Sequence, residues 1–102
     1  MIRHVVMLKL HEFADGADKQ TNAMRVKDTM EAMRGNIDGL LSLEVGINQL
    51  PEAQAYDVVL ITTITSWDAL ESYRVHPPHR AVIALLNKVR SDRVVADFEV
   101  AE

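Results

Sequence analysis

The chain has 102 residues, of which 48% are hydrophobic and 25% are charged. This length suits one domain over residues 1–102 and excludes separate cofactor and substrate domains, while the apolar share excludes a disordered chain. The formal net charge is −4 without any cluster of Lys or Arg, which argues against nucleic acid as a partner. The absence of cysteine excludes disulfides, thiolate nucleophiles, Fe–S clusters and Cys-ligated zinc. With neither a signal-peptide pattern nor an apolar run of membrane length, we expect a cytoplasmic protein that contacts no membrane.

The first half of the chain predicts a strand, a helix and a second strand. Residues 2–10 are rich in β-branched side chains and are partly apolar on both faces, which a half-exposed strand would not need. Residues 19–34 predict a helix that stops near Gly35, because apolar residues recur there at spacings of three and four. Residues 40–48 are the clearest strand, since polar positions alternate with the apolar residues Leu41, Leu43, Val45 and Ile47.

The second half predicts a strand, a helical region with a break, and a final strand. Residues 56–65 are again apolar on both faces. Thr65 and Ser66 are good N-cap candidates for a helical stretch over 67–75, and the sequence His-Pro-Pro-His over 76–79 breaks that stretch. A further helix follows, with apolar residues at helical spacing: Val82, Leu85, Leu86 and Val89. The last strand is expected from Arg93 or Val94 to about Val100.

This order of elements is β-α-β-β-α-β, which predicts an α+β, ferredoxin-like fold. In that fold one four-stranded antiparallel sheet carries both helices on the same face, so its other face would be wet in a monomer. The two doubly apolar strands place one set of side chains (Val6, Leu8, Val58 and Leu60) opposite another (Val5, Met7, Val59 and Ile61). We therefore expect a homodimer in which two sheets pack face to face and bury at least about 1,200 Å² in total.

The histidines are the most informative chemical groups, because the chain has no nucleotide-binding loop and no serine-nucleophile motif. His4, with apolar neighbours in the first strand, is either a structural core histidine or one that faces a ligand between sheet and helices. His79 opens the last helix and is equally a surface residue or a site residue. His76 is expected to hold the turn before a proline, and His11 to be solvated. Tyr73 either packs as an amphipathic side chain or turns its hydroxyl toward the same interior.

A metal site is the weaker interpretation of these histidines. His76 and His79 are three residues apart, but Pro77 and Pro78 between them make a shared helical face improbable. No carboxylate lies in the segment to complete a hard site. We therefore expect neither a metal nor another cofactor.

Several segments together resemble the stress-responsive α/β-barrel domain (Dabb) family. They are His4-Val5-Val6-Met7-Leu8-Lys9-Leu10, Gly39-Leu40, Ser66-Trp67, Tyr73-Arg74-Val75-His76-Pro77-Pro78-His79 and Val95-Ala96-Asp97-Phe98. The resemblance covers nearly the whole chain and implies a ferredoxin-like fold and a homodimer whose two sheets form a dimeric α/β barrel.

Within this family the chain resembles the plant polyketide cyclases that make olivetolic acid by aldol condensation. That resemblance implies a pocket lined by His4, Tyr73 and His79. His79 would be the general base, His4 would assist proton transfer or orient the substrate, and Tyr73 would bond a substrate oxygen. Residues that would bind a long ketide chain are not recognisable here. The positive end of the last helix is expected to lower the pKa of His79 and keep this base neutral at pH 7.

Three classes of function follow. The first is a cofactor-independent lyase or cyclase that acts on a carbonyl compound through His79, His4 and Tyr73. The second is a non-catalytic, small-molecule-binding or stress-response dimer in which the same residues only bond a ligand. The third is a cofactor-free oxygenase, which rests on analogy of fold alone. Matching of three polar positions to the cyclase pattern favours the first class.

Overall fold

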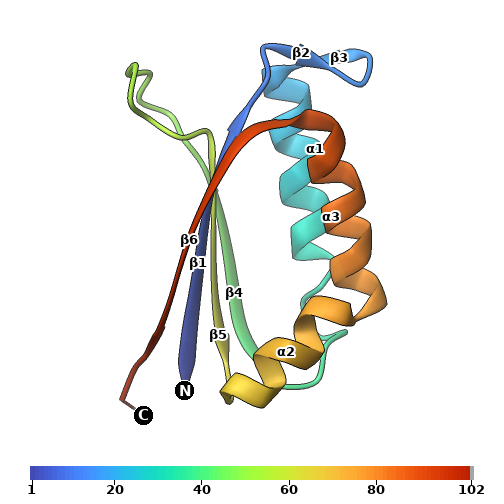
Figure 1. The fold of residues 1–102 in the computed structure, drawn as a ribbon. Helices are drawn as coiled ribbons and strands as arrows, with labels where there is room; N and C mark the ends of the chain where they lie inside the picture. The colour runs from blue at the N-terminus through green and yellow to red at the C-terminus, as the bar shows by residue number, and fades with distance from the viewer. Residues whose placement is uncertain (102) are drawn as a thin grey trace.

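A computed structural model describes residues 1–101 as one antiparallel sheet with three helices on one face (Figure 1). The sheet has the strand order β4-β5-β1-β6, and its strands are β1 (Ile2–Leu10), β4 (Leu40–Ile47), β5 (Val58–Ile64) and β6 (Arg90–Glu99). The helices are α1 (Lys19–Glu31), α2 (Trp67–Val75) and α3 (Pro77–Val89). This arrangement confirms the predicted ferredoxin-like fold. It adds a small hairpin that was not predicted, made of β2 (Phe13–Ala14) and β3 (Ala17–Asp18).

The helix boundaries follow from local capping. The side chain of Asp18 accepts a hydrogen bond from the backbone N–H of Thr21 and begins α1, and Ser66 does the same for α2 through Ala69. The extent predicted for α2 is confirmed. The prediction for α1 was too long, because α1 ends at Glu31 and the N–H of Met33 bonds back three residues to the carbonyl of Met30.

The last strand begins earlier than predicted. Arg90 is already extended and ends α3, so the chain passes from helix to strand without a loop. The polar run Arg90–Asp92 resembles a loop in sequence, yet it pairs with Lys9 and Leu10 at the end of β1. An edge strand tolerates such polar residues because one of its sides meets solvent.

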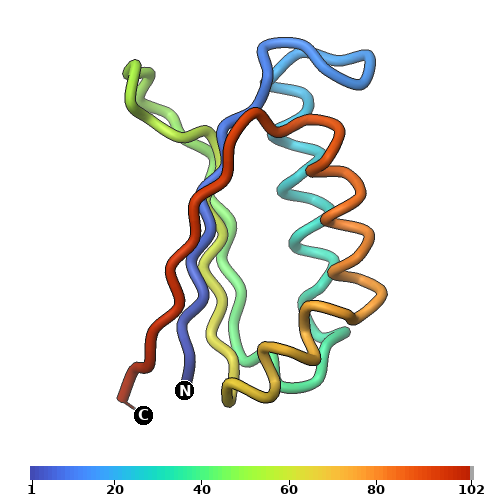
Figure 2. Tube along the Cα trace, in the orientation of Figure 1, coloured from blue at the N-terminus to red at the C-terminus, as the bar shows by residue number. Residues whose placement is uncertain are grey.

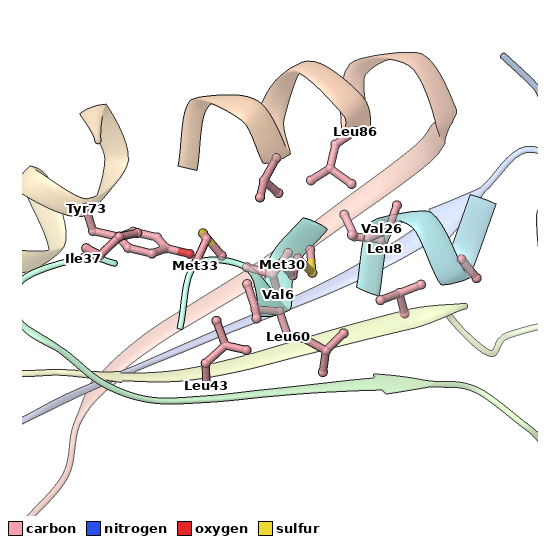
Figure 3. Close-up of a cluster of buried hydrophobic side chains, with 14 of the residues drawn as sticks. Val6, Leu8, Val26, Met30, Met33, Ile37, Leu43, Leu60, Tyr73 and Leu86 are labelled. Carbon is pink, nitrogen blue, oxygen red and sulfur yellow. The ribbon is translucent and has the colours of Figure 1, made fainter. Parts of the chain in front are cut away.

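The core lies between the sheet and the helices (Figure 3). Even-numbered residues of β1 and β5, including Val6, Leu8 and Leu60, are buried there against Val26 and Met30 of α1. Alternation along the strands puts the odd-numbered residues on the opposite face, as predicted. That outer face carries an apolar set of seven residues: Val5, Met7, Val59, Ile61, Val94, Ala96 and Phe98.

Leu41 departs from the alternation predicted for residues 40–48. The register of β4 against β5 shifts between Leu40 and Ser42, so Leu41 has no partner in the ladder and is 55% exposed. Leu40, one residue earlier, packs against the core instead. A bulge of this kind moves one side chain out of alternation without changing the rest of the strand.

The two ends of the sheet differ. The termini lie side by side at the end where α2 is placed, whereas residues 48–57 project from the other end, on the side away from the helices (Figure 2). Among the described residues, no helix combines the length and the apolar character needed to cross a membrane.

Candidate functional site

The structure brings His4, Tyr73 and His79 together from three elements. His4 projects from β1 toward the helices and is 4% exposed, and Tyr73 in the last turn of α2 is 1% exposed. The ring centroids of His4 and Tyr73 are 5.9 Å apart, and those of Tyr73 and His79 are 4.4 Å apart. The cluster therefore lies between sheet and helices and not on the outer face. The catalytic roles of its three members stay a prediction.

The break between α2 and α3 positions Tyr73 and His79 next to each other. His76 is extended, with φ −68° and ψ 138°, because a residue before proline avoids the helical region. Pro77 then starts α3 at its first position, where a missing N–H costs nothing. The chain thus changes direction at a single residue, and the first turn of α3 comes to lie beside the last turn of α2.

His79 is held in one orientation by the end of α2. Its Nδ1 donates to the backbone carbonyl of Arg74 at 3.0 Å, which leaves Nε2 with a free lone pair while the ring is neutral. Burial lowers the pKa of His79, and the electrostatic effects of His4, Arg93 and Arg74 lower it further, against the opposing effect of the Arg74 carbonyl. The direction agrees with the prediction, but the main cause is burial and not the helix dipole.

The Tyr73 hydroxyl is buried and has no hydrogen-bond partner among the described residues. Figure 3 shows its ring extending from α2 toward Met33 of the hydrophobic core. Burial raises the pKa of Tyr73 to about 12, although the charge of Arg93 acts in the opposite direction. The hydroxyl is therefore a protonated donor at neutral pH. A buried polar group without a partner costs about 1–3 kcal/mol, so this position favours a ligand oxygen or a water molecule.

Asp97 is a member of the cluster that the sequence reasoning did not select as a site residue. It lies opposite His4 in the β1–β6 register, and its Oδ1 accepts a hydrogen bond from His4 Nδ1. A carboxylate on Nδ1 fixes the tautomer of an imidazole and leaves Nε2 for a ligand. Only the register of β1 against β6 could have revealed this pair, and that register is not evident from either strand alone.

The cluster borders a small cavity of about 10 Å³, which has room for about one water molecule. Ten residues line it: His4, Val6, Met30, Leu60, Tyr73, His79, Val82, Ile83, Leu86 and Arg93. A larger, open hollow of about 580 Å³ lies beside residues 48–57. Its Lys19 is already paired with Glu12 at 3.0 Å and Asp57 at 3.6 Å, so we place the candidate site at the smaller cavity.

The other two histidines do not line this cavity. His11 is exposed, in line with its predicted solvation, and its backbone N–H donates to the carbonyl of Val89. His76 occupies the predicted turn, where its Nδ1 is buried. Over residues 1–101, no three His, Asp or Glu side chains are grouped closely enough to hold a metal ion.

Solved structures with known activities share this fold at low sequence identity. A hydroxynitrile lyase from Passiflora edulis is 12% identical and has a TM-score of 0.78, over 99% of this chain and 94% of that one. A cofactor-independent oxygenase from Streptomyces nogalater is 16% identical with a TM-score of 0.68, over 99% and 93% of the two chains. These similarities show the fold alone.

Other proteins are more similar in sequence. A dimeric protein of unknown function with a ferredoxin-like fold from Bacteroides fragilis is 24% identical with a TM-score of 0.83, over 97% of this chain and 95% of that one. An uncharacterized protein of Streptomyces coelicolor is 32% identical over 100 residues, which is 97% of this chain and 99% of the relative. The model of the stress-responsive A/B barrel domain matches residues 2–100, so the chain belongs to the Dabb family.

Proposed function

We propose that this protein is a lyase or cyclase that needs no cofactor and moves a proton at a carbon next to a carbonyl group. The observation that carries this proposal is the Tyr73 hydroxyl, buried without a partner and flanked by two imidazole rings. A neutral imidazole accepts a proton near neutral pH, and a hydroxyl donor stabilises the oxygen on which negative charge develops.

Each residue has a distinct role in this reaction. His79 Nε2 removes a proton from the α-carbon, the C–H electron pair forms the C=C bond of an enolate, and the carbonyl π pair moves to oxygen. Tyr73 donates a hydrogen bond to that oxygen. His4, held by Asp97, presents its Nε2 to orient the substrate or to relay a proton. Return of the proton from His79 to carbon completes a simple exchange. In a cyclase, the enolate carbon attacks a second carbonyl carbon, the π pair of that carbonyl moves to its oxygen, and the alkoxide takes the proton from His79.

Exchange of hydrogen for deuterium tests the proposal without knowledge of the natural substrate. A panel of β-dicarbonyl and polyketide-like compounds is incubated with the protein in D₂O, and the α-proton signal is followed by NMR. We expect enzyme-dependent exchange for at least one compound, and its loss in His79→Ala. No exchange with any compound would contradict the proposal, and full exchange in His79→Ala would remove His79 from it.

The second class of function, a dimer that binds a small molecule without turnover, would use the same residues to bond the ligand. The cavity of about 10 Å³ admits no ligand larger than a water molecule unless side chains of α3 such as Ile83 move. Ligand binding with no exchange would support this class. Nothing in the site specifically favours the cofactor-free oxygenase.

We also propose that the protein is a homodimer. The outer face exposes apolar side chains that a monomer would leave in water, including Met7 at 39% and Phe98 at 45%. The Bacteroides fragilis protein with the same fold is described as dimeric. Pairing of two outer faces would cover these side chains and leave the His4–Tyr73–His79 cluster on the opposite side of each sheet.

A further inference from the structure

Arg93 is a cation at the candidate site that the reaction described above does not use. It pairs with Leu8 in the β1–β6 register, which places it on the helix side of the sheet, and it lines the same cavity as Tyr73 and His79. Its positive charge contributes to the lowered pKa of His79 and opposes the rise that burial causes in the pKa of Tyr73. The Arg93 guanidinium is therefore near the groups that would bind and deprotonate a substrate.

Arg93 differs from the two acidic side chains on the helix side of β6. Asp97 is bonded to His4, and Glu99 accepts a hydrogen bond from the Trp67 indole N–H at 2.9 Å. Arg93 forms no ion pair with any carboxylate in the described part of the chain. Arg90, which pairs with the core-side Leu10, also forms no ion pair in the described residues, but of these two arginines only Arg93 lines the cavity.

We propose that Arg93 makes this site selective for carbonyl compounds that also carry a carboxylate, the class of oxocarboxylates. The inference rests on the proposed function, because it assigns a substrate class to the same cavity. A guanidinium presents two parallel N–H donors that match the two oxygens of a carboxylate. The substrate carbonyl would then bond the Tyr73 hydroxyl, with the α-carbon at His79.

The chain as a whole does not attract anions, since its formal net charge is −4. Selectivity for an anion must therefore come from a local cation that faces the bound molecule. Arg93 is exposed on the edge strand β6, and its long side chain lines the cavity together with Ile83 of α3.

A matched pair of probes tests this inference through binding alone. 4-Oxopentanoate and its methyl ester have the same ketone and differ in the carboxylate charge. Their dissociation constants are measured by NMR titration of the His and Tyr ring signals. We expect the anion to bind about tenfold or more tightly than the ester, as for a charge-assisted hydrogen bond. Arg93→Gln should weaken binding of the anion to the level of the ester and leave the ester unchanged.

Arg80→Gln is the matched control, because this substitution also removes one positive charge. Arg80 is exposed on α3 and does not line the cavity. It should keep the preference for the anion, and Arg93→Lys should keep part of it. Equal binding of anion and ester by the native protein, absence of binding by both, or an equal loss in Arg80→Gln would overturn the inference. Enzyme-dependent deuterium exchange into neutral dicarbonyl compounds does not depend on Arg93 binding a carboxylate, so it could still be observed in each of these cases. Failure of this inference is therefore distinguishable from failure of the proposed function.

Discussion

Tyr73 illustrates how a side chain can be well buried while its polar atom lacks a hydrogen-bond partner. The Tyr73 ring packs between two imidazoles, yet its hydroxyl meets no acceptor or donor within residues 1–101. A purely structural tyrosine at such a position gains nothing from its oxygen. The oxygen is explained if it serves a ligand.

Tyr73→Phe separates these two interpretations. Removal of an unsatisfied buried hydroxyl should leave the free energy of unfolding unchanged or raise it by about 1 kcal/mol. The exchange rate should fall about a hundredfold or more, as for loss of an oxyanion donor. Urea unfolding and the deuterium assay measure the two effects. A large loss of stability would show that the hydroxyl has a structural role, and an unchanged rate would show that it has no role in the reaction.

His79 provides a second prediction, which concerns pH. Its pKa is lowered in the folded protein, so below pH 6.5 the unfolded chain binds more protons than the folded one. Stability therefore decreases as the pH falls from 7 through this range, and His79→Gln should make the decrease shallower. His79→Ala should also reduce the rate about a hundred- to ten-thousandfold. Thermal unfolding between pH 5 and 8 is the measurement. If stability depended on pH as steeply in His79→Gln as in the native protein, His79 would not be the source of the decrease.

The turn between α1 and β4 depends on a glycine for two reasons at once. Gly39 has φ +85°, and a Cβ added there would lie 2.9 Å from the Cβ of Ala69 near the start of α2. Gly16, in the β2–β3 turn, has φ +78° but open space around it. The two positions share the same backbone conformation and differ only in steric room.

Gly39→Ala should therefore destabilise the fold more than Gly16→Ala. Left-handed backbone costs a residue with a Cβ about 1–2 kcal/mol at both sites, and overpacking against Ala69 adds about 1–3 kcal/mol at Gly39 alone. Urea unfolding of both variants gives the difference. Equal destabilisation would mean that α2 moves freely away from the turn.

The elements that the sequence predicted best are those with a local cause. Ser66 and Pro77 delimit α2 through capping and backbone restriction, which act within a few residues. The early start of β6 and the bulge at Leu41 are set by pairing with distant strands, so no local pattern predicts them. The same holds for the candidate site: His4, Tyr73 and His79 were found through local motifs and a resemblance, whereas Asp97 depends on the register of β1 against β6.

For the whole molecule, the outer face is the feature to test. Ile61→Asp places a charge at the centre of the proposed sheet-to-sheet interface and should dissociate or unfold the dimer, because a buried unpaired charge is strongly destabilising. Phe13→Asp is the control, since Phe13 is equally apolar but lies in the small hairpin away from this face. Sedimentation equilibrium gives the mass of each. A native species of 11.5 kDa at micromolar concentration would contradict the dimer.

The pairing of β1 with β6 has a consequence for how this protein is made. β1 leaves the ribosome first, but one of its edges stays without a partner until residues 90–99 follow. An apolar strand with an open edge is prone to pair with other chains, and contacts so distant in sequence form slowly. A product truncated before Arg90 would also lack Arg93 and Asp97. Only a chain synthesised through β6 can both complete its sheet and assemble the candidate site, so incomplete products would lack that site and be prone to aggregate.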